Sequence, residues 1–374
     1  MRLKSLTVQD FRNIPAARFE PSAHLTVICG RNGQGKTNLL EAVWLLTGSK
    51  SFRGARDAEL VAQGSPFAAV EGETEGFAAE NRIRIAVAGP GGEGLGLKKG
   101  RTAQVNGVDW GRATNLAGTF TAVVFHPGHL SLVKGSPEGR RRFLDAALCQ
   151  LYPGYLALLR RYTRQVAQRN ALLKAYGRTA GAAELLDVFD EKLAEYGAQV
   201  AARRRAYLAR IGPEVCATYR DISDGREALA LAYQPSFTPA EGGDAQDGRA
   251  ALLAVLRAAR SRDLAAGFCT AGPHREDFTL TLDGRDARIY ASQGQQRSAV
   301  LALKLAEAAV LRDETGEHPV MLLDDVLSEL DEGRQRYLLR RMEGRQTIVT
   351  ACDEAAFART DGKICTMEAG RLEG

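Results

Sequence analysis

The sequence lacks a long apolar segment. Among its 374 residues, no apolar stretch approaches the roughly 18–20 residues that a helix needs to cross a bilayer. The first residues, Met1 to Val8, alternate in the manner of a strand and have no apolar signal-peptide core. We therefore expect neither a membrane protein nor a secreted one, and we predict a cytoplasmic location.

Cysteine and histidine are few and widely spaced. No two of the six cysteines form a C-x-x-C pair, and the five histidines have no spacing typical of metal ligands. The cysteines are Cys29, Cys149, Cys216, Cys269, Cys352 and Cys365. This distribution argues against a disulfide framework and a zinc site, and it favours reduced, mostly buried thiols.

The composition is that of a soluble globular protein, but the charge is unevenly distributed. Hydrophobic residues make up 45% of the chain and charged residues 25%, and this length suffices for two or three structural units. The segment from His126 to Ala180 contains ten Lys and Arg against two acidic residues, a net charge of +8, so the rest carries −3 of the total +5. A basic region on an otherwise slightly acidic chain predicts a polyanionic partner.

A glycine-rich segment near the N-terminus matches G-x-x-x-x-G-K-[ST], the phosphate-binding P-loop. Its glycines let backbone N–H groups turn toward phosphate oxygens. Lys36 would reach the β- and γ-phosphates, and the Thr37 hydroxyl would ligate Mg²⁺. The predicted nucleotide-binding residues are Gly30, Arg31, Asn32, Gly33, Gln34, Gly35, Lys36, Thr37 and Asn38.

The neighbours of the P-loop support this interpretation. His24–Cys29 is typical of a buried strand, and Asn38–Leu46 is typical of a helix, whose N-terminus would point toward the bound anion. The alternative is a glycine-rich turn that ends in Lys-Thr by chance. A P-loop by itself leaves a kinase, a GTPase, a motor protein and a transporter subunit all open.

The secondary-structure patterns predict an α/β fold that is split by a helical insertion. The first 110 residues are rich in strand-like alternation, the middle is helical, and strands and helices alternate again from about Phe268. In the middle we predict helices over 156–174, 187–219 and 249–266, the second interrupted at Gly212-Pro213. Residues 1–125 and 268–374 would form the α/β head, and residues 126–267 an inserted, basic, helical arm.

A second motif supplies the acids that a P-loop requires. Val320–Asp325 is an apolar strand followed by two carboxylates, the Walker B pattern, which would deliver them to the sheet edge beside the P-loop. Asp324 would bind Mg²⁺, and Asp325 would polarise the attacking water. The alternative is a strand that ends in two solvated acids.

The segment Ser292-Gln293-Gly294-Gln295-Gln296-Arg297 opens a long predicted helix. Ser292 and Gln295 form a capping box, which alone explains both residues. Gly294 is costly in a first helical turn unless another group approaches the backbone closely. Because a helix N-terminus with these residues also receives phosphate, and this chain already has one P-loop, we expect it to meet a nucleotide on another copy.

In this order, the motifs resemble the ABC-type ATPase heads of the SMC kind, and most closely the RecF family of bacterial recombination mediators. The resemblance is carried by the P-loop, the S-Q-G-Q-Q-R segment, residues 322–331, and further segments at 11–13, 132–145 and 272–277. It covers nearly the whole chain. It implies a mixed β-lobe and a parallel α/β core with an inserted helical arm.

The resemblance also assigns roles to particular residues. Lys36 and Asp325 would be catalytic, and Arg12 and Asn13 would lie near the nucleotide, although a structural role at the end of a strand is an equal alternative. Residues 328–331 would form the D-loop at a dimer interface, unless Ser328 simply caps a helix. The residues that would contact the γ-phosphate of the opposite subunit are Ser292, Gly294 and Gln295.

The sequence departs from the ABC pattern at three places. Asp325 replaces the usual catalytic glutamate and is one methylene shorter, which predicts slow hydrolysis. The switch histidine is missing, and Thr350 and Asp353 are the candidates in that region. No Q-loop glutamine follows the strand at 122–125, where His126 stands instead.

The function that the resemblance implies is an ATP-controlled DNA clamp in DNA replication and recombinational repair. Two chains would close on ATP and Mg²⁺, bind duplex DNA at single-strand gaps and, with RecR and RecO, promote the loading of RecA. The predicted DNA-binding residues are Arg140, Arg141, Arg160, Arg161 and Arg164, although arginines between apolar helix positions are often only a solvated face and Arg140 to Arg142 could form internal ion pairs. The alternatives are a scaffold that binds ATP without hydrolysis and, less compatible with these motifs, a transporter ATPase.

Overall fold

The computed structural model describes residues 1–77, 79–92, 100–238, 245–353 and 362–373. Its contacts divide the chain into two compact units. Unit 1 comprises residues 1–130, 217–226 and 292–374, and unit 2 comprises residues 131–216 and 227–291. The N-terminal and C-terminal parts of the sequence therefore contribute to one compact unit.

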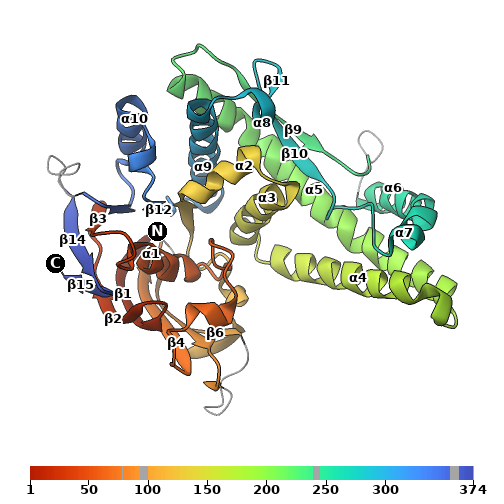
Figure 1. Ribbon diagram of the computed structural model, residues 1–374, viewed down its shortest axis with the longest axis horizontal. Helices are drawn as coiled ribbons and strands as arrows, with labels where there is room; N and C mark the ends of the chain where they lie inside the picture. Colours follow the sequence, from red (N-terminus) through yellow and green to blue (C-terminus); the bar gives the residue numbers. More distant parts are fainter. Residues whose placement is uncertain (78, 93–99, 239–244, 354–361, 374) are drawn as a thin grey trace. The chain divides into compact units, whose positions relative to one another are not determined.

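Unit 1 contains a six-stranded sheet with the order β15-β14-β3-β13-β12-β8. Figure 1 labels four of its strands, β15, β14, β3 and β12. The strands β14, β3, β13, β12 and β8 are parallel, and β15 pairs antiparallel at the edge. Their bounds are β3 Leu25–Cys29, β8 Ala122–Phe125, β12 Val320–Asp324, β13 Thr347–Ala351, β14 Lys363–Glu368 and β15 Arg371–Glu373. Because the strands are parallel, the segments that follow β3, β12 and β13 all leave from the same edge of the sheet.

A second sheet of unit 1 is antiparallel and has the order β2-β1-β4-β5-β6-β7. Its strands are β1 Arg2–Phe11, β2 Ile14–Phe19, β4 Phe67–Glu75, β5 Glu80–Ala88, β6 Arg101–Val105 and β7 Val108–Arg112. Helix α1 (Lys36–Leu45) contacts β1 and β4 of this sheet and β12 and β13 of the parallel sheet (Figure 1). Because it lies between two sheets, α1 is buried almost all round, from Leu39 to Leu45, and one hydrophobic core joins both sheets.

The remaining elements of unit 1 are short turns of helix and two longer helices. Helix α9 (Gln293–Thr315) begins at the S-Q-G-Q-Q-R segment, packs against β8, and has an almost continuously buried middle. Helix α10 (Glu332–Met342) follows the Walker B strand. The short helices are η1 Asp57–Leu60, η3 Ala113–Leu116, η4 Pro127–Leu130 and η6 Leu327–Glu329.

Unit 2 is mostly helical. Its helices are α2 Ser131–Lys134, α3 Pro137–Leu151, α4 Tyr155–Ala175, η5 Tyr176–Arg178, α5 Ala182–Ile222, α6 Ala245–Ala258, α7 Arg260–Ala266 and α8 Ala287–Tyr290. Two sequence predictions were wrong in detail. Helix α5 continues through Gly212-Pro213, so the turns on either side of Pro213 hold the helix despite the lost hydrogen bond. The single helix predicted over 249–266 is two helices, divided at Ala259.

Three antiparallel strands complete unit 2, in the order β11-β10-β9. Strand β9 (Leu229–Gln234) pairs along its whole length with β10 (Asp277–Leu282), and β11 (Arg285–Asp286) is short. This pairing places residues 268–291 in unit 2, whereas the sequence assigned them to the head. The final residues of α5, from Ala217, pack with unit 1. Strand pairing between segments about 45 residues apart is invisible to local periodicity, so this boundary could not be predicted.

In the part of the chain that the structure describes, no helix is both long and apolar enough to cross a membrane. The six cysteines are all free thiols. No group of three or more His, Cys, Asp or Glu among the described residues has the arrangement of a metal site.

Candidate nucleotide-binding site

The predicted P-loop connects β3 to α1, as the sequence pattern requires. The side chain of Lys36 is 6% exposed and folds back over the loop. Its Nζ donates to the carbonyl oxygens of Gly30, at 2.5 Å, and of Arg31, at 3.0 Å. The ammonium group is thus held by neutral carbonyl acceptors, and no carboxylate of the described residues pairs with it, which suits a group that meets phosphate.

Two glycines of the loop cannot be replaced without a clash or backbone strain. A Cβ on Gly30 would lie 2.3 Å from the carbonyl oxygen of Met367, and Gly35 has a φ of +115°. Asn13 donates to the carbonyl oxygen of Gly33 at 3.2 Å and accepts from Asn38 at 2.7 Å. The structure therefore brings Asn13 and the P-loop together, and Asn13 supports the shape of the loop.

The other predicted loop residues have distinct surroundings. Gln34 accepts from the backbone N–H of Ala369 at 2.6 Å, so it ties the loop to the end of β14. Asn32 and Arg31 are exposed at the tip. The loop is anchored at its base and open at its tip, where a phosphate group has access to the backbone.

The Walker B aspartate lies directly beside the P-loop threonine. The Thr37 hydroxyl donates to Asp324 Oδ1 at 2.7 Å, and the Thr350 hydroxyl donates to the same oxygen at 3.0 Å. Thr350 also accepts from the backbone N–H of Asp325 at 2.9 Å. Thr350, predicted only as a candidate for the missing switch residue, thus links β13 to Asp324 of β12 and to Asp325, which follows it.

The electrostatics of Asp324 suit a cation ligand. Burial raises the pKa of its carboxyl above the usual aspartate range, while the hydrogen bonds from Thr37 and Thr350 oppose that shift. A hydroxyl and a carboxylate side by side are hard oxygen donors of the kind that Mg²⁺ prefers. The residues present therefore fit a Mg²⁺ ion bound through Thr37 and Asp324.

Asp325 is held in a strained conformation at the end of β12. Its φ is +51°, in the left-handed region that few non-glycine residues adopt. Its backbone N–H is fixed by Thr350, and its carboxylate accepts from the Ser328 hydroxyl at 3.0 Å. Such strain at a non-glycine position is typical of functional sites.

Helix α10 is capped by Asp331, which accepts from Arg334 N–H at 3.0 Å. Ser328 bonds instead to Asp325, so the predicted alternative that Ser328 caps the helix was wrong.

Arg12, predicted near the nucleotide, is bonded elsewhere. Its guanidinium donates to both carboxylate oxygens of Glu41, at 3.0 and 3.1 Å, and to the carbonyl oxygen of Glu59 at 3.2 Å. Glu41 is completely buried within α1. These bonds support the structural alternative, in which Arg12 neutralises a buried glutamate, and its contact with a nucleotide remains untested.

Sequence reasoning missed two residues of this region. Cys352 follows β13, and its Sγ lies 3.1 Å from Asn32 Oδ1 and 3.8 Å from Lys36 Nζ. Arg53 donates to Asn38 Oδ1 at 2.9 Å. Its positive charge opposes the burial-driven rise in the pKa of Asp324 and adds to the burial-driven fall in the pKa of His126. Neither residue belongs to a recognisable spacing pattern, so the local sequence did not predict their place in the site. Asp353, the other switch candidate, is exposed beyond β13.

His126 stands at the end of β8 and forms a compact aromatic group. Its ring centroid lies 3.9 Å from that of His129 and 5.1 Å from that of Phe52. Burial lowers the pKa of His126 to about 4, with further lowering by the charges of Lys304 and Arg53. The ring is therefore neutral at pH 7 and available as a hydrogen-bond acceptor or ligand, which leaves its proposed place as a Q-loop substitute chemically reasonable.

The predicted signature residues form the start of α9. Ser292 Oγ accepts from Gln295 N–H at 3.3 Å, and Gln295 Oε1 accepts from Ser292 N–H at 2.7 Å, so the capping box is complete. Ser292 is exposed. A Cβ on Gly294 would meet only the flexible guanidinium of Arg334, at 3.4 Å. The first turns of α9 therefore lie beside α10, whose Arg334 donates from Nε to Ser298 Oγ at 2.7 Å.

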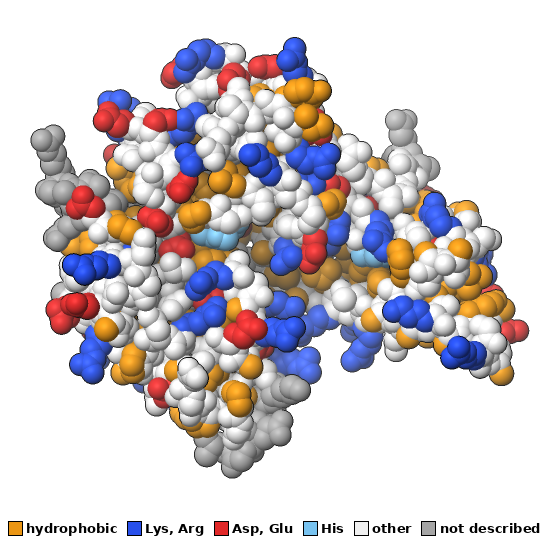
Figure 2. Space-filling view, viewed as in Figure 1, with side chains coloured by type: hydrophobic (Ala, Val, Ile, Leu, Met, Phe, Trp, Pro, Cys, Tyr) orange, Lys and Arg blue, Asp and Glu red, His pale blue; other side chains and the backbone are white. Residues whose placement is uncertain are grey.

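The predicted DNA-binding arginines separate into two groups, both in unit 2. Arg140 is buried and pairs with both oxygens of Asp277 at 2.7 Å, and Arg141 donates to the carbonyl oxygen of Glu276 at 2.7 Å. The internal ion pair makes Arg140 a structural residue, so its assignment to DNA was wrong. The exposed arginines of α4 are Arg160, Arg161 and Arg164, and Figure 2 shows Lys and Arg side chains on the surface of the region labelled α4 in Figure 1.

Asp324→Asn should stabilise the nucleotide-free chain and abolish its response to Mg²⁺. The raised pKa means that the folded chain binds a proton at Asp324 more tightly than the unfolded chain does, so stability falls as the pH rises above the ordinary aspartate range. The neutral amide of asparagine removes the loss of stability that comes from burying an ionised carboxylate. We expect a melting temperature about 2–4 °C higher at neutral pH, no difference at a pH below that range, and no stabilisation by Mg²⁺ with ATP.

The control for this experiment is Asp313→Asn, which removes an exposed carboxylate paired with Arg312. It should leave the melting temperature and the Mg²⁺ response unchanged. Differential scanning fluorimetry across pH measures all three chains. A variant Asp324→Asn that melts below the wild type at neutral pH would contradict this account of the site.

The fold and the site together define a class of protein. The class is an ATPase head of the ABC type. In its parallel sheet, one strand separates the P-loop strand from the Walker B strand. An antiparallel sheet packs on the first helix, and the signature helix begins at an exposed, capped serine. A solved SMC head bound to the C-winged helix domain of ScpA has the same fold, with a TM-score of 0.56 at 16% identity over 100% of this chain and 96% of that one.

Closer relatives specify the family. A family model described as the RecF/RecN/SMC N terminal domain matches residues 2–370. A DNA replication and repair protein RecF from Anaeromyxobacter dehalogenans (strain 2CP-C) is 43% identical over 99% of this chain and 95% of its own, and one from Myxococcus xanthus (strain DK1622) is 41% identical over 94% and 91%. The chain belongs to the RecF family.

A solved member of that family agrees over the whole chain. A structure described as the recombination mediator protein RecF-ATPrS in the RecFOR pathway has a TM-score of 0.90 at 34% identity, covering 100% of this chain and 97% of that one. A second structure, described as RecF-ATP in the same pathway, has the same TM-score and identity.

Proposed function

We propose that this protein is an ATP-dependent DNA-binding protein of recombinational repair, which dimerises on ATP and hydrolyses it slowly. The observation that carries the proposal is the cluster in which Lys36 lies within the P-loop and Thr37 and Thr350 both bond to Asp324. Relatives described as RecF-ATP and as DNA replication and repair proteins support an ATP ligand and a role in repair.

The residues of the cluster divide the chemistry among them. The P-loop N–H groups and Lys36 would bind the phosphates of ATP, and Thr37 with Asp324 would hold Mg²⁺. The ion would supply positive charge against the phosphate oxygens. Asp325 would orient and polarise the attacking water, and Ser328 holds its carboxylate in place. Since Asp325 is shorter than the glutamate usual at this position, its reach toward a water is reduced, and slow hydrolysis follows.

The signature residues support a site shared between two chains. Ser292 and Gln295 satisfy each other's bonds at an exposed helix start, whereas the phosphate-binding cluster is built from the P-loop, β12 and β13. The Ser292 helix start of another copy would complete the set of ligands around a phosphate that is already bound in one P-loop. Those contacts exist only in the dimer, so ATP would drive association.

DNA would be bound through its phosphates. The exposed arginines of α4 at positions 160, 161 and 164 would contact duplex DNA near a gap in a salt-dependent and largely sequence-independent manner. RecR and RecO are the partners that the RecF resemblance implies for loading RecA. The competing proposal is a scaffold that binds ATP and DNA without turnover.

Sedimentation with ATP or ADP, combined with phosphate release, tests this function. We expect monomers with ADP, dimers with ATP, and slow phosphate release that duplex DNA accelerates. An ATP-dependent dimer without phosphate release, even with DNA, would favour the scaffold. A chain that remains monomeric with ATP and does not bind duplex would contradict the proposal.

A further inference from the structure

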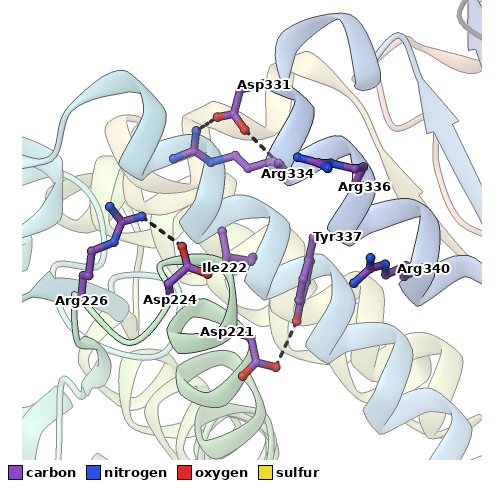
Figure 3. Close-up of a pocket in the computed structure, with 10 residues that line it drawn as sticks. Asp221, Ile222, Asp224, Arg226, Asp331, Arg334, Arg336, Tyr337 and Arg340 are labelled. Atoms are coloured by element: carbon purple, nitrogen blue, oxygen red, sulfur yellow. Dashed lines mark hydrogen bonds and ion pairs between the residues drawn. The ribbon is translucent and has the colours of Figure 1, made fainter.

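A pocket of about 400 Å³ opens in unit 1, and its lining includes no residue of the P-loop cluster. It lies between the end of α5 with the turn that follows and one side of α10 (Figure 3). Its charged and aromatic lining comprises Asp221, Asp224, Arg226, Asp331, Arg334, Arg336, Tyr337 and Arg340. The nucleotide site uses none of these side chains.

Each of the three acids in the pocket is already paired. Asp331 pairs with Arg334 and caps α10, and Asp224 pairs with Arg226 at 3.2 Å. Asp221 accepts from the hydroxyl of Tyr337 at 3.3 Å and pairs with Arg341 at 3.4 Å. Figure 3 shows the first two pairs and the bond between Tyr337 and Asp221. The negative charge of the pocket is thus fully balanced by its own neighbours.

Two arginines of the pocket, Arg336 and Arg340, take no part in these ion pairs. Arg336 makes one hydrogen bond, from Nε to the carbonyl oxygen of Glu332 at 3.3 Å. Neither Arg336 nor Arg340 forms an ion pair with an acid among the residues that the structure covers. Both are exposed, and in Figure 3 both guanidinium groups extend along the side of α10 that carries Tyr337. The pocket therefore presents two uncompensated positive charges.

Their arrangement on the helix is unfavourable in the free protein. Positions 336 and 340 are four residues apart, so the two guanidinium groups share one face, and like charges at this spacing destabilise a helix. An anionic ligand would relieve this repulsion.

We propose that this pocket is a groove for the phosphate backbone of a nucleic-acid strand, with Arg336 and Arg340 as its phosphate ligands. Guanidinium forks match phosphate oxygens bidentately. The Cβ atoms of residues four apart on a helix are roughly 5–6 Å from each other, so each arginine takes a separate phosphate of one strand. An acidic protein segment carries its charges on flexible side chains and would not require two free arginines in register.

The inference rests on the proposed function in one respect, that the polyanion is nucleic acid. It extends that function by giving unit 1 a contact of its own, in addition to the arginines of α4 in unit 2. Nucleic acid would then touch the unit that carries the nucleotide site, at a helix whose N-cap, Asp331, belongs to the predicted D-loop.

The test compares the full chain with Arg336→Gln/Arg340→Gln. The matched control is Arg112→Gln/Arg371→Gln, which removes the same charge from two exposed positions of unit 1. Fluorescence anisotropy with a labelled blunt duplex, at saturating ATP, is measured between about 50 and 200 mM salt. We expect the slope of log K against log salt to become shallower by about 0.9 for each lost phosphate contact, roughly 1.8 in all, and the control to keep the wild-type slope.

A third variant separates charge from geometry. Arg336→Lys/Arg340→Lys keeps both charges, so it should keep the salt slope while binding more weakly, because lysine lacks the bidentate fork. A Gln variant whose slope equals that of the control would overturn the groove while leaving the proposed function intact. A Gln variant that keeps its DNA slope but loses binding of labelled polyglutamate would also overturn it, in favour of a protein surface. A wild-type chain that binds no duplex would contradict both.

Discussion

The Lys36→Met chain is expected to remain folded, to form no dimer with ATP, and to hydrolyse ATP at least about 100-fold more slowly than the wild type. The ammonium group of Lys36 is held at the centre of the P-loop by the carbonyl oxygens of Gly30 and Arg31, and these neutral acceptors leave its charge for phosphate. Methionine keeps the length and apolar packing of the stem but supplies no charge. Without it, the phosphates lose their main side-chain ligand.

The matched control is Lys4→Met, which removes an exposed lysine paired with Glu80 on the antiparallel sheet. It should leave dimerisation and turnover unchanged, because exposed ion pairs contribute little. Sedimentation and phosphate release measure both chains, and melting curves confirm that they are folded. A Lys36→Met chain that still dimerises on ATP would show that the P-loop is not the nucleotide site that controls association.

The second large effect is expected from Ser292→Arg, which should abolish the ATP-dependent dimer while sparing nucleotide binding by the monomer. Ser292 is exposed at the start of α9, and an arginine there would fill the space that the proposed shared site assigns to the partner's nucleotide. The lost N-cap costs about 1 kcal/mol, too little to unfold the chain. Binding of a fluorescent ATP analogue, measured beside sedimentation, distinguishes the two properties.

Ser292→Thr is the control for this variant. Threonine keeps a hydroxyl that accepts from Gln295 N–H, so the cap is preserved and the dimer should form nearly as in the wild type. If Ser292→Arg sediments as the same ATP-dependent dimer as Ser292→Thr, the start of α9 does not lie at the interface between copies.

The parts of the site that could be predicted from the sequence are those encoded in contiguous residues. The P-loop and its flanking strand and helix form one unbroken segment, and the two acids of β12 follow directly from an apolar run. Their convergence then follows from the geometry of parallel strands, whose carboxyl ends meet at one sheet edge. The contact between Thr37 and Asp324, 287 residues apart in the chain, is the outcome.

The parts that could not be predicted depend on long-range pairing between polar side chains. Arg140 belongs by composition to a basic cluster, yet Asp277, 137 residues away, neutralises it. Arg12 likewise meets the buried Glu41 of α1. Composition counts charges without their partners, so it overestimates the basic surface wherever arginines are buried in ion pairs. At α10, composition underestimates the positive surface. The nearby acids are paired with other residues, and Arg336 and Arg340 form no ion pair among the described residues.

The central claim is that each ATP site takes its P-loop from one chain and its signature helix from another. Mixing Lys36→Met with Ser292→Arg tests it most directly, because each chain supplies the half that the other lacks. In a mixed dimer, the intact Lys36 of one chain would face the intact Ser292 of its partner, and we predict ATP turnover that neither variant has alone. A mixture no more active than the sum of the two separate chains would contradict the shared site.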